Sequence, residues 1–174
     1  AHRQEASRLR ERIGERSDLI VHGHSKGLEG SGRHMNPTRP GSPRWRIRSP
    51  CSAALVSKKA ADGSAGYELA HTNGKLSLVV GVSNPKTLTA SCILTNGTWY
   101  HLVGTYGGTN QRLYVNGGLV ASTNWDWGTG GSSILVTNLA LRIGASAASL
   151  TNFACGTFDD VRVYEDAIAS NQVY

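Results

Sequence analysis

The chain has 174 residues, and its 18 Lys or Arg against 12 Asp or Glu give a formal net charge of +6. The excess positive charge lies in residues 1–50, which contain 11 basic and 5 acidic side chains, whereas residues 51–174 contain 7 of each. A chain of this length can bury one sizeable core, and the even charge of residues 51–174 argues against a dedicated nucleic-acid-binding domain. No window reaches the roughly 18 apolar residues of a membrane span.

Residues 1–50 have the composition of a basic leader with little structure. Leu9, Ile13 and Ile20 fall near one face of a predicted short amphipathic helix over residues 1–22. Residues 23–50 are rich in Gly, Ser, Pro and Arg without periodicity, which predicts loop or disorder. We therefore predict a leader over residues 1–50 and a folded domain over residues 51–174.

From Ser52 onward, short β-favouring runs alternate with turn-forming residues. The predicted strands are AALVSKK, GYELAH, KLSLVVGV, TLTASCIL, Trp99–Tyr106, Arg112–Val115, LVAST, LALRIGA and GTFDDVRVY. Asn116-Gly117 predicts a tight hairpin turn, because both central residues of such a turn need positive φ. EDAIASNQ predicts one closing helical turn. Evenly spaced short strands with almost no helix predict an all-β fold, an antiparallel two-sheet sandwich or jelly roll.

Several segments, in this order, resemble a laminin-G-like jelly roll of the concanavalin A-like lectin/glucanase group. They are Leu55–Lys58, Gly66–Leu69, Gly97–Val103, Leu113–Gly117, Leu141–Gly144 and Phe158–Tyr164. The resemblance implies a two-sheet sandwich, a module of a secreted or surface protein, and a carbohydrate-binding or adhesion function. Because the sequence has no paired catalytic carboxylates, we predict a non-catalytic recognition module that binds a carbohydrate or an extracellular protein partner. The N-terminus lacks the apolar core of a signal peptide, so the extracellular or cell-surface location is implied by the resemblance alone.

Members of this family begin with one or two strands that pair with the closing strand, and residues 1–50 show no such pattern. Two alternatives follow. Either a divergent segment of residues 1–50 supplies those strands, or the sandwich has an unpaired sheet edge. An unpaired edge favours self-association, because its backbone groups are free to pair with another chain.

The tripeptide Trp125-Asp126-Trp127 is the predicted ligand-binding site. It lies in a glycine-rich loop between LVAST and LALRIGA, and in an extended loop both indoles project to one side and the carboxylate to the other. Sugar binding uses an aromatic ring against the C–H face of a pyranose and polar groups for its hydroxyls, and loops often carry binding residues. The alternative is that the indoles fold back to cap the sandwich, since Trp is usually well buried.

A calcium site at Asp159 and Asp160 is a second hypothesis. In a continuous strand Asp159 shares the inward face of Val161 and Val163, and an inward carboxylate needs hydrogen bonds, a cation or a metal. The resemblance implies a structural calcium ion, because many concanavalin A-like folds bind one. Asp62 and Asn73 supply suitable oxygen ligands in type but not in spacing. A hydrogen-bonded structural Asp is the alternative.

Two further sequence features concern covalent modification. Asn96-Gly97-Thr98 is a formal N-glycosylation acceptor, usable in a eukaryotic secretory route. Cys51, Cys92 and Cys155 permit one disulfide in any of three pairings, and the odd count argues against a disulfide-dependent scaffold.

Three other functions remain as alternatives. A glucanase-like enzyme needs two carboxyl groups about 5–5.5 Å apart, which jelly-roll glucanases supply from a Glu-x-Asp-x-x-Glu run. No such run occurs here, since Asp159 and Asp160 alternate in direction and Glu68 stands alone in its strand, so we predict no catalytic residues. A purely structural accessory domain is the second alternative. The third is a polyanion binder that uses the basic leader, with binding that weakens steeply as salt rises.

Overall fold

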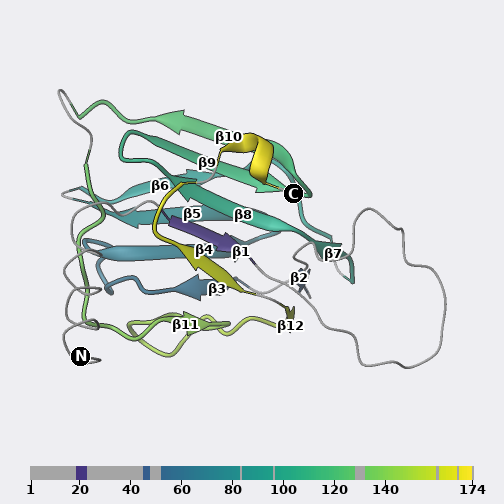
Figure 1. The fold of residues 1–174 in the computed structure, drawn as a ribbon. Coiled ribbons are helices and arrows are strands. Elements are labelled where there is room, and N and C mark those ends of the chain that lie inside the picture. The colour runs from purple at the N-terminus through teal and green to yellow at the C-terminus, as the bar shows by residue number, and fades with distance from the viewer. Residues whose placement is uncertain are drawn as a thin grey trace, which may run out of the picture.

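The computed structural model describes residues 19–22, 45–47, 52–82, 84–95, 97–127, 132–159, 161–167 and 169–173 (Figure 1). The described residues form strands and one 3-10 helix, with no α-helix among them, which confirms the all-β prediction. The elements are β1 (Leu19–His22), β2 (Trp45–Ile47), β3 (Ala53–Ser57), β4 (Gly66–Thr72), β5 (Lys75–Gly81), β6 (Lys86–Thr89), β7 (Trp99–Tyr100), β8 (Leu102–Tyr106), β9 (Asn110–Val115), β10 (Gly118–Asn124), β11 (Arg142–Ile143), β12 (Gly156–Phe158), β13 (Arg162–Tyr164) and η1 (Ser170–Gln172). No helix of this described part is long and apolar enough to cross a membrane.

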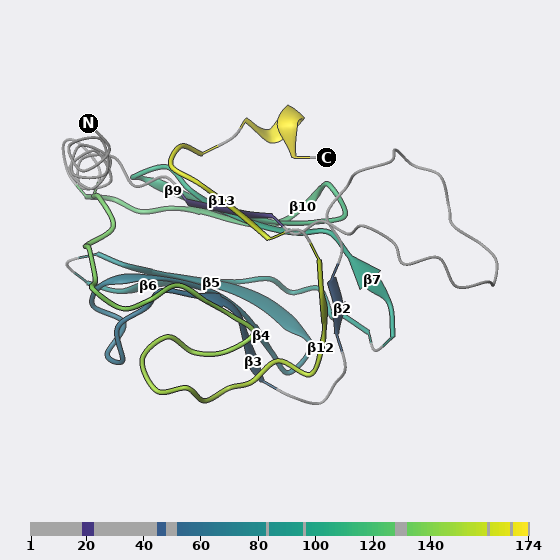
Figure 2. The same ribbon diagram turned by 60° about the horizontal axis from the view of Figure 1, so that its bottom comes forward.

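Two five-stranded antiparallel sheets form the predicted sandwich. The first sheet has the order β10-β9-β8-β1-β13, and the second has the order β11-β3-β4-β5-β6. A third, smaller sheet with the order β12-β2-β7 lies at one end, and Figure 2 shows it beside the two stacked layers. The strands β10 and β6 are the edges of their sheets on the same side of the sandwich, where they contact each other.

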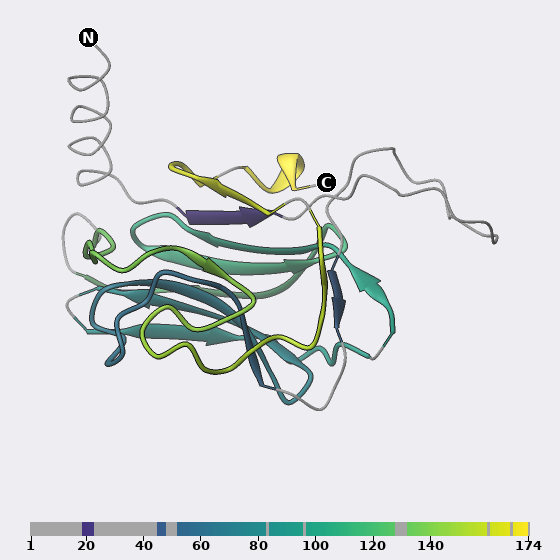
Figure 3. The same ribbon diagram turned by 90° about the horizontal axis from the view of Figure 1, so that it is seen from below.

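Residues 1–50 contribute two strands, so the prediction of a leader with little structure is wrong for these segments. Leu19–His22 forms a strand rather than the end of a helix, and it fills the place between β8 and β13 in the first sheet. Figure 3 shows this strand, in purple, running beside the yellow β13. The strand Trp45–Ile47 pairs with β7 and β12. The divergent-segment alternative is therefore confirmed, and the closing strand is paired; the other residues of the leader lie outside the described part.

The core lies between the two main sheets and follows the period-two alternation of the strands. In β5, Leu76, Leu78 and Val80 have no exposed surface, and they pack against residues of the facing sheet such as Leu102 and Leu113. Full burial of each aliphatic side chain stabilises the fold by about 1.5–3 kcal/mol relative to its exposed state. Packing of the inner faces is therefore the main force that holds the two sheets together.

The closing helical turn packs on the outer face of the first sheet. Val173 joins Val103 and Tyr114 in a small buried cluster separate from the main core. The hydroxyl groups of Tyr114 and Ser170 form a hydrogen bond of 2.8 Å. The prediction of a single helical turn near the end of the chain is confirmed, and its role is to cover apolar groups that the sandwich interior does not use.

The hairpin at Asn116-Gly117 is confirmed, since both residues have positive φ, 50° and 79°. The predicted strand over Trp99–Tyr106 is interrupted at His101, so that β7 belongs to the third sheet and β8 to the first. The backbone N–H of His101 donates to Asn116 Oδ1 at 2.9 Å. This bond holds the hairpin turn against the residue at which the chain passes from the third sheet to the first.

Candidate functional site

The loop that carries Trp125, Asp126 and Trp127, here called the tryptophan loop, begins where β10 ends. It lies on the side of the sandwich where the edge strands β10 and β6 contact each other. The backbone N–H of Trp125 donates to Thr109 O at 2.7 Å, which holds the start of the loop against the turn before β9. Lys86, the first residue of β6, reaches across from the second sheet. Its Nζ lies 4.9 Å from the ring centroid of Trp125 and 5.0 Å from that of Trp127. We call Lys86, Trp125 and Trp127 the indole cluster.

Both indoles face the same ammonium group, so they project to one side, as the alternation in an extended loop predicts. Each ring lies within the roughly 6 Å that allows a cation–π interaction, worth about 0.5–1 kcal/mol at exposed sites. Asp126, between them in sequence, is exposed. The cluster therefore combines two aromatic surfaces with a fixed positive charge.

Gln111 sets the position of Trp125. It has no exposed surface, although it is polar, and its Nε2 donates to the Leu78 carbonyl oxygen at 2.7 Å. Its Oε1 accepts the Trp125 Nε1–H at 2.9 Å. The Gln111 side chain, on β9 of the first sheet, thus bonds both to β5 of the second sheet and to the tryptophan loop. Its hydrogen bonds satisfy groups that would be costly to bury unpaired.

The indoles also contribute to the core, as the capping alternative predicts. Trp125 and Trp127 are half-buried, and both pack against the main hydrophobic cluster. The Trp127 Nε1–H is buried and has no hydrogen-bond partner among the described residues. Each ring therefore has a buried portion that stabilises the sandwich edge and a portion that is exposed.

Sequence reasoning found Trp125, Asp126 and Trp127 but missed the other two members of the arrangement. Gln111 had a usable signal, because it shares the inward face of Leu113 and is polar where the alternation predicts an apolar residue. Lys86 had no such signal. It is distant in sequence, and only the pairing of strands within and between the sheets brings it to the loop.

The structural basis of the calcium hypothesis at Asp159 and Asp160 is wrong in one respect. The segment is not one strand, because β12 ends at Phe158 and β13 begins at Arg162, and these strands lie in different sheets. Strand alternation therefore does not direct Asp159 inward. Asp159 is half-buried, Val163 on the supposed inward face is 40% exposed, and Asp160 lies outside the described residues.

Asp62 and Asn73 do not belong to a single ion site. Asp62 lies before β4 and Asn73 lies after it, so the full length of a strand, roughly 3.3 Å per residue, separates them. Asp62 Oδ1 also accepts hydrogen bonds from the N–H and hydroxyl groups of Ser64, at 3.0 and 2.7 Å. Within the described ranges, no group of three or more His, Cys, Asp or Glu can hold a metal ion.

Calcium at Asp159 and Asp160 thus stays a prediction from the resemblance, and a chelator tests it. If the ion stabilises the fold, EDTA lowers the Tm and added calcium restores it, because a ligand that binds only the native state raises stability. The measurement is thermal unfolding in EDTA, calcium and magnesium. A Tm that is the same in all three contradicts a structural calcium ion.

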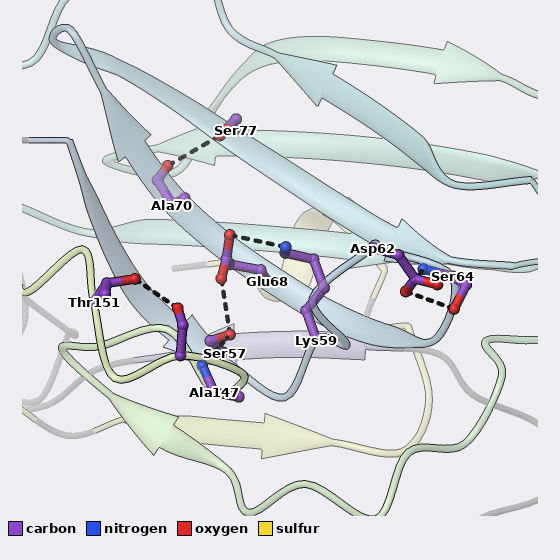
Figure 4. Close-up of polar contacts among 10 residues, drawn as sticks. Ser57, Lys59, Asp62, Ser64, Glu68, Ala70, Ser77, Ala147 and Thr151 are labelled. Carbon is purple, nitrogen blue, oxygen red and sulfur yellow. Dashed lines mark hydrogen bonds and ion pairs between the residues drawn. The ribbon is translucent and has the colours of Figure 1, made fainter.

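Glu68, the one acidic residue of the central strands, is engaged within the protein (Figure 4). Ser57 Oγ donates to Glu68 Oε2 at 2.8 Å, and Lys59 Nζ lies 3.8 Å from Glu68 Oε1. The Ala147 N–H donates to Ser57 Oγ at 3.1 Å. These contacts fasten the loop after β11 onto β3 and β4, so the carboxylate has a structural role.

The covalent-modification predictions are only partly covered by the structure. Asn96 and Cys51 lie outside the described residues, and glycosylation at Asn96 stays a prediction. Cys92 is a half-buried free thiol, and Cys155 is exposed.

The sandwich is shared with a known family of proteins. The model of the Laminin_G_3 family, of the concanavalin A-like lectin/glucanases superfamily, matches residues 45–174. The chain belongs to this family. The matched range begins at β2, which agrees with the finding that the sandwich includes strands from before residue 51. Among curated proteins, none matches the chain.

Three solved structures illustrate the similarity of fold. Ruminococcus gnavus IT-sialidase CBM40 bound to α2,3-sialyllactose is 12% identical with a TM-score of 0.62, over 92% of this chain and 82% of that one. A proposed carbohydrate-binding protein of Bacteroides ovatus is 15% identical with a TM-score of 0.63, over 90% of this chain and 40% of that one. Mouse laminin α1 domains LG4–5 are 13% identical with a TM-score of 0.59, over 91% of this chain and 38% of that one. This chain thus spans less than half of the latter two proteins.

Proposed function

We propose that the chain is a non-catalytic recognition module that binds glycans at the indole cluster. The observation that carries the proposal is the convergence of two half-exposed indoles and one ammonium group at a single edge of the sandwich. Aromatic rings offer a large apolar surface to the C–H face of a sugar. A small number of fixed polar groups then gives such a site its orientation and specificity.

The fold and family support recognition as the class of function. Similar solved structures include a CBM40 bound to sialyllactose and domains of laminin, and these proteins have the same sandwich architecture. A fold does not determine a function, so the site must carry the argument. An extracellular or cell-surface setting is part of the proposal, in keeping with the modules that share this fold.

Two observations favour binding over hydrolysis. The Glu68 carboxylate already bonds to Ser57 and Lys59, so it is not free to act on a substrate. No paired carboxylate run of the glucanase type occurs in the sequence. We therefore expect no turnover of β-glucans, which an assay for released reducing sugar checks.

A glycan array on the full chain, followed by calorimetry with the best ligand, tests the proposal. Trp127→Ala is the informative variant, because Trp127 makes no hydrogen bond through its indole N–H to the described residues. We expect about a tenfold loss of affinity, the equivalent of roughly 1.4 kcal/mol of lost stacking. Trp99→Ala is the matched control, since Trp99 is 38% exposed in the third sheet.

The control separates a binding role from a purely structural one. The proposal is supported if Trp127→Ala keeps its Tm within a few degrees and loses glycan binding, while Trp99→Ala still binds the glycan. Unchanged affinity in a folded Trp127→Ala variant overturns it and leaves the indoles with a capping role alone.

A further inference from the structure

Lys86 is a half-buried cation that no carboxylate of the described residues neutralises. Within this part of the chain its ammonium group makes no ion pair, and its contacts are the rings of Trp125 and Trp127. By contrast, Lys59 is paired with Glu68. Removing an ammonium group partly from water without a counter-charge is unfavourable, and cation–π contacts offset such a cost. An anion that pairs with the Lys86 ammonium group would therefore be favourable.

We propose that Lys86 makes the indole cluster selective for acidic glycans, those that carry a carboxylate or sulfate, over neutral ones. The inference rests on the proposed function, because it assigns the ligand class of the same site. The ammonium group lies against both indoles, which are the surfaces that a sugar needs. A ligand therefore has to compete with Lys86 or to pair with it.

Neutral and acidic sugars differ in how they meet this lysine. A neutral sugar that stacks on an indole displaces the ammonium group and loses cation–π contacts without replacing them. An acidic sugar draws the ammonium group off the ring by forming a charge-assisted hydrogen bond with it, so the indole surface becomes available while the charge stays compensated. Lys86 thus weakens the binding of neutral glycans and strengthens the binding of acidic glycans.

The acidic residue of the loop does not reverse this preference. Asp126 stands between the two tryptophans in sequence, and its side chain is exposed. The group that lies over both rings is instead the Lys86 ammonium group. The charge that a ligand meets between the two rings is therefore that of Lys86, which is positive.

The test compares two ligands that differ in a single group. The ligands are an oligosaccharide ending in a hexuronic acid and the same oligosaccharide with that carboxyl reduced to an alcohol. Calorimetry on the full chain is expected to show about tenfold tighter binding of the acid, the equivalent of roughly two cation–π contacts. Lys86→Met is expected to weaken binding of the acid about tenfold and to leave binding of the alcohol equal or tighter.

Lys75→Met is the matched control, because Lys75 is an exposed lysine that begins β5 as Lys86 begins β6. It removes the same charge and is expected to keep the preference for the acid. Binding of the acid should also weaken as salt is raised from about 50 to about 500 mM, while binding of the alcohol should not. This salt comparison uses the unsubstituted chain, so it remains decisive if Lys86→Met does not fold.

The outcomes separate this inference from the function on which it rests. Equal affinity for the two ligands, unaffected by Lys86→Met or by salt, overturns the selectivity and leaves glycan binding intact. Absence of binding to either ligand and to every glycan of the array overturns glycan binding itself, and the selectivity with it.

Discussion

Gly66→Ala is expected to cost about 3–5 kcal/mol of unfolding free energy, because it combines overpacking with a strained backbone. A Cβ at this position would overlap the backbone carbonyl oxygen of Lys58 and lie 2.8 Å from Thr137 Cγ2. Gly66 also has a φ of +76°, which side-chain-bearing residues rarely adopt. Its N–H donates to Leu135 O at 2.7 Å, so the clash falls where the segment after the tryptophan loop docks onto β4.

Gly108→Ala is the control that isolates steric overlap from backbone conformation. Gly108 has a similar φ of +73°, but a Cβ added there would meet no atom within 4 Å. The cost should therefore be about 1–2 kcal/mol, from the left-handed backbone alone. Denaturant unfolding of both variants measures the difference, and equal losses would show that Gly66 is not closely packed.

Gln111→Met is expected to destabilise the fold by about 2–4 kcal/mol, because two hydrogen-bonding groups lose their partner in the interior. Methionine has nearly the same length and shape as glutamine but cannot donate to Leu78 O or accept from Trp125 Nε1. The loss should appear in the unfolding free energy. The same change should also weaken glycan binding, because the Trp125 ring is no longer held.

Leu113→Met is the matched control for that variant. Leu113 lies on the same strand and the same inward face, has no exposed surface, and is replaced by a residue of similar volume. Such an exchange usually costs less than about 1.5 kcal/mol. If Leu113→Met and Gln111→Met lose equal stability and neither alters binding, the amide does not position Trp125.

Local signals in the sequence predicted most of the sandwich. The runs that became β3, β4, β5, β8 and β9 combine β-favouring residues with turn residues at both ends, and Asn116-Gly117 adopts the turn that its residue types favour. The predicted strand LALRIGA shrank to Arg142–Ile143, because pairing with β3 extends over just two residues. Strand length there depends on a partner remote in the sequence, which local propensity does not report.

The strands within residues 1–50 could not be predicted for the same reason. Leu19–His22 contains β-favouring residues, but Ile20 also completed an apparent helical period with Leu9 and Ile13. The pairing of Ile20 with Tyr164 and Thr105 decides between these interpretations, and both partners are far along the chain. Tertiary context thus overrode a weak helical pattern.

The candidate site was predictable to the extent that it is contiguous. Trp125 and Trp127 stand close to each other in an obvious loop, whereas Lys86 and Gln111 reach them from β6 and β9. Asp159 shows the converse error, because the alternation argument assumed one strand where the chain passes between two sheets. Periodicity predicts the direction of a side chain only within an unbroken element.

Glycan recognition at the indole cluster can be observed at the rings themselves, by a titration that follows the tryptophan indole N–H signals in a proton–nitrogen correlation spectrum. The chain has four tryptophans, so each signal can be assigned by substitution. We predict that the Nε1–H signals of Trp125 and Trp127 move with one common Kd, while that of Trp99 stays in place. A bound glycan that leaves the Trp125 and Trp127 signals unmoved would contradict recognition at this cluster.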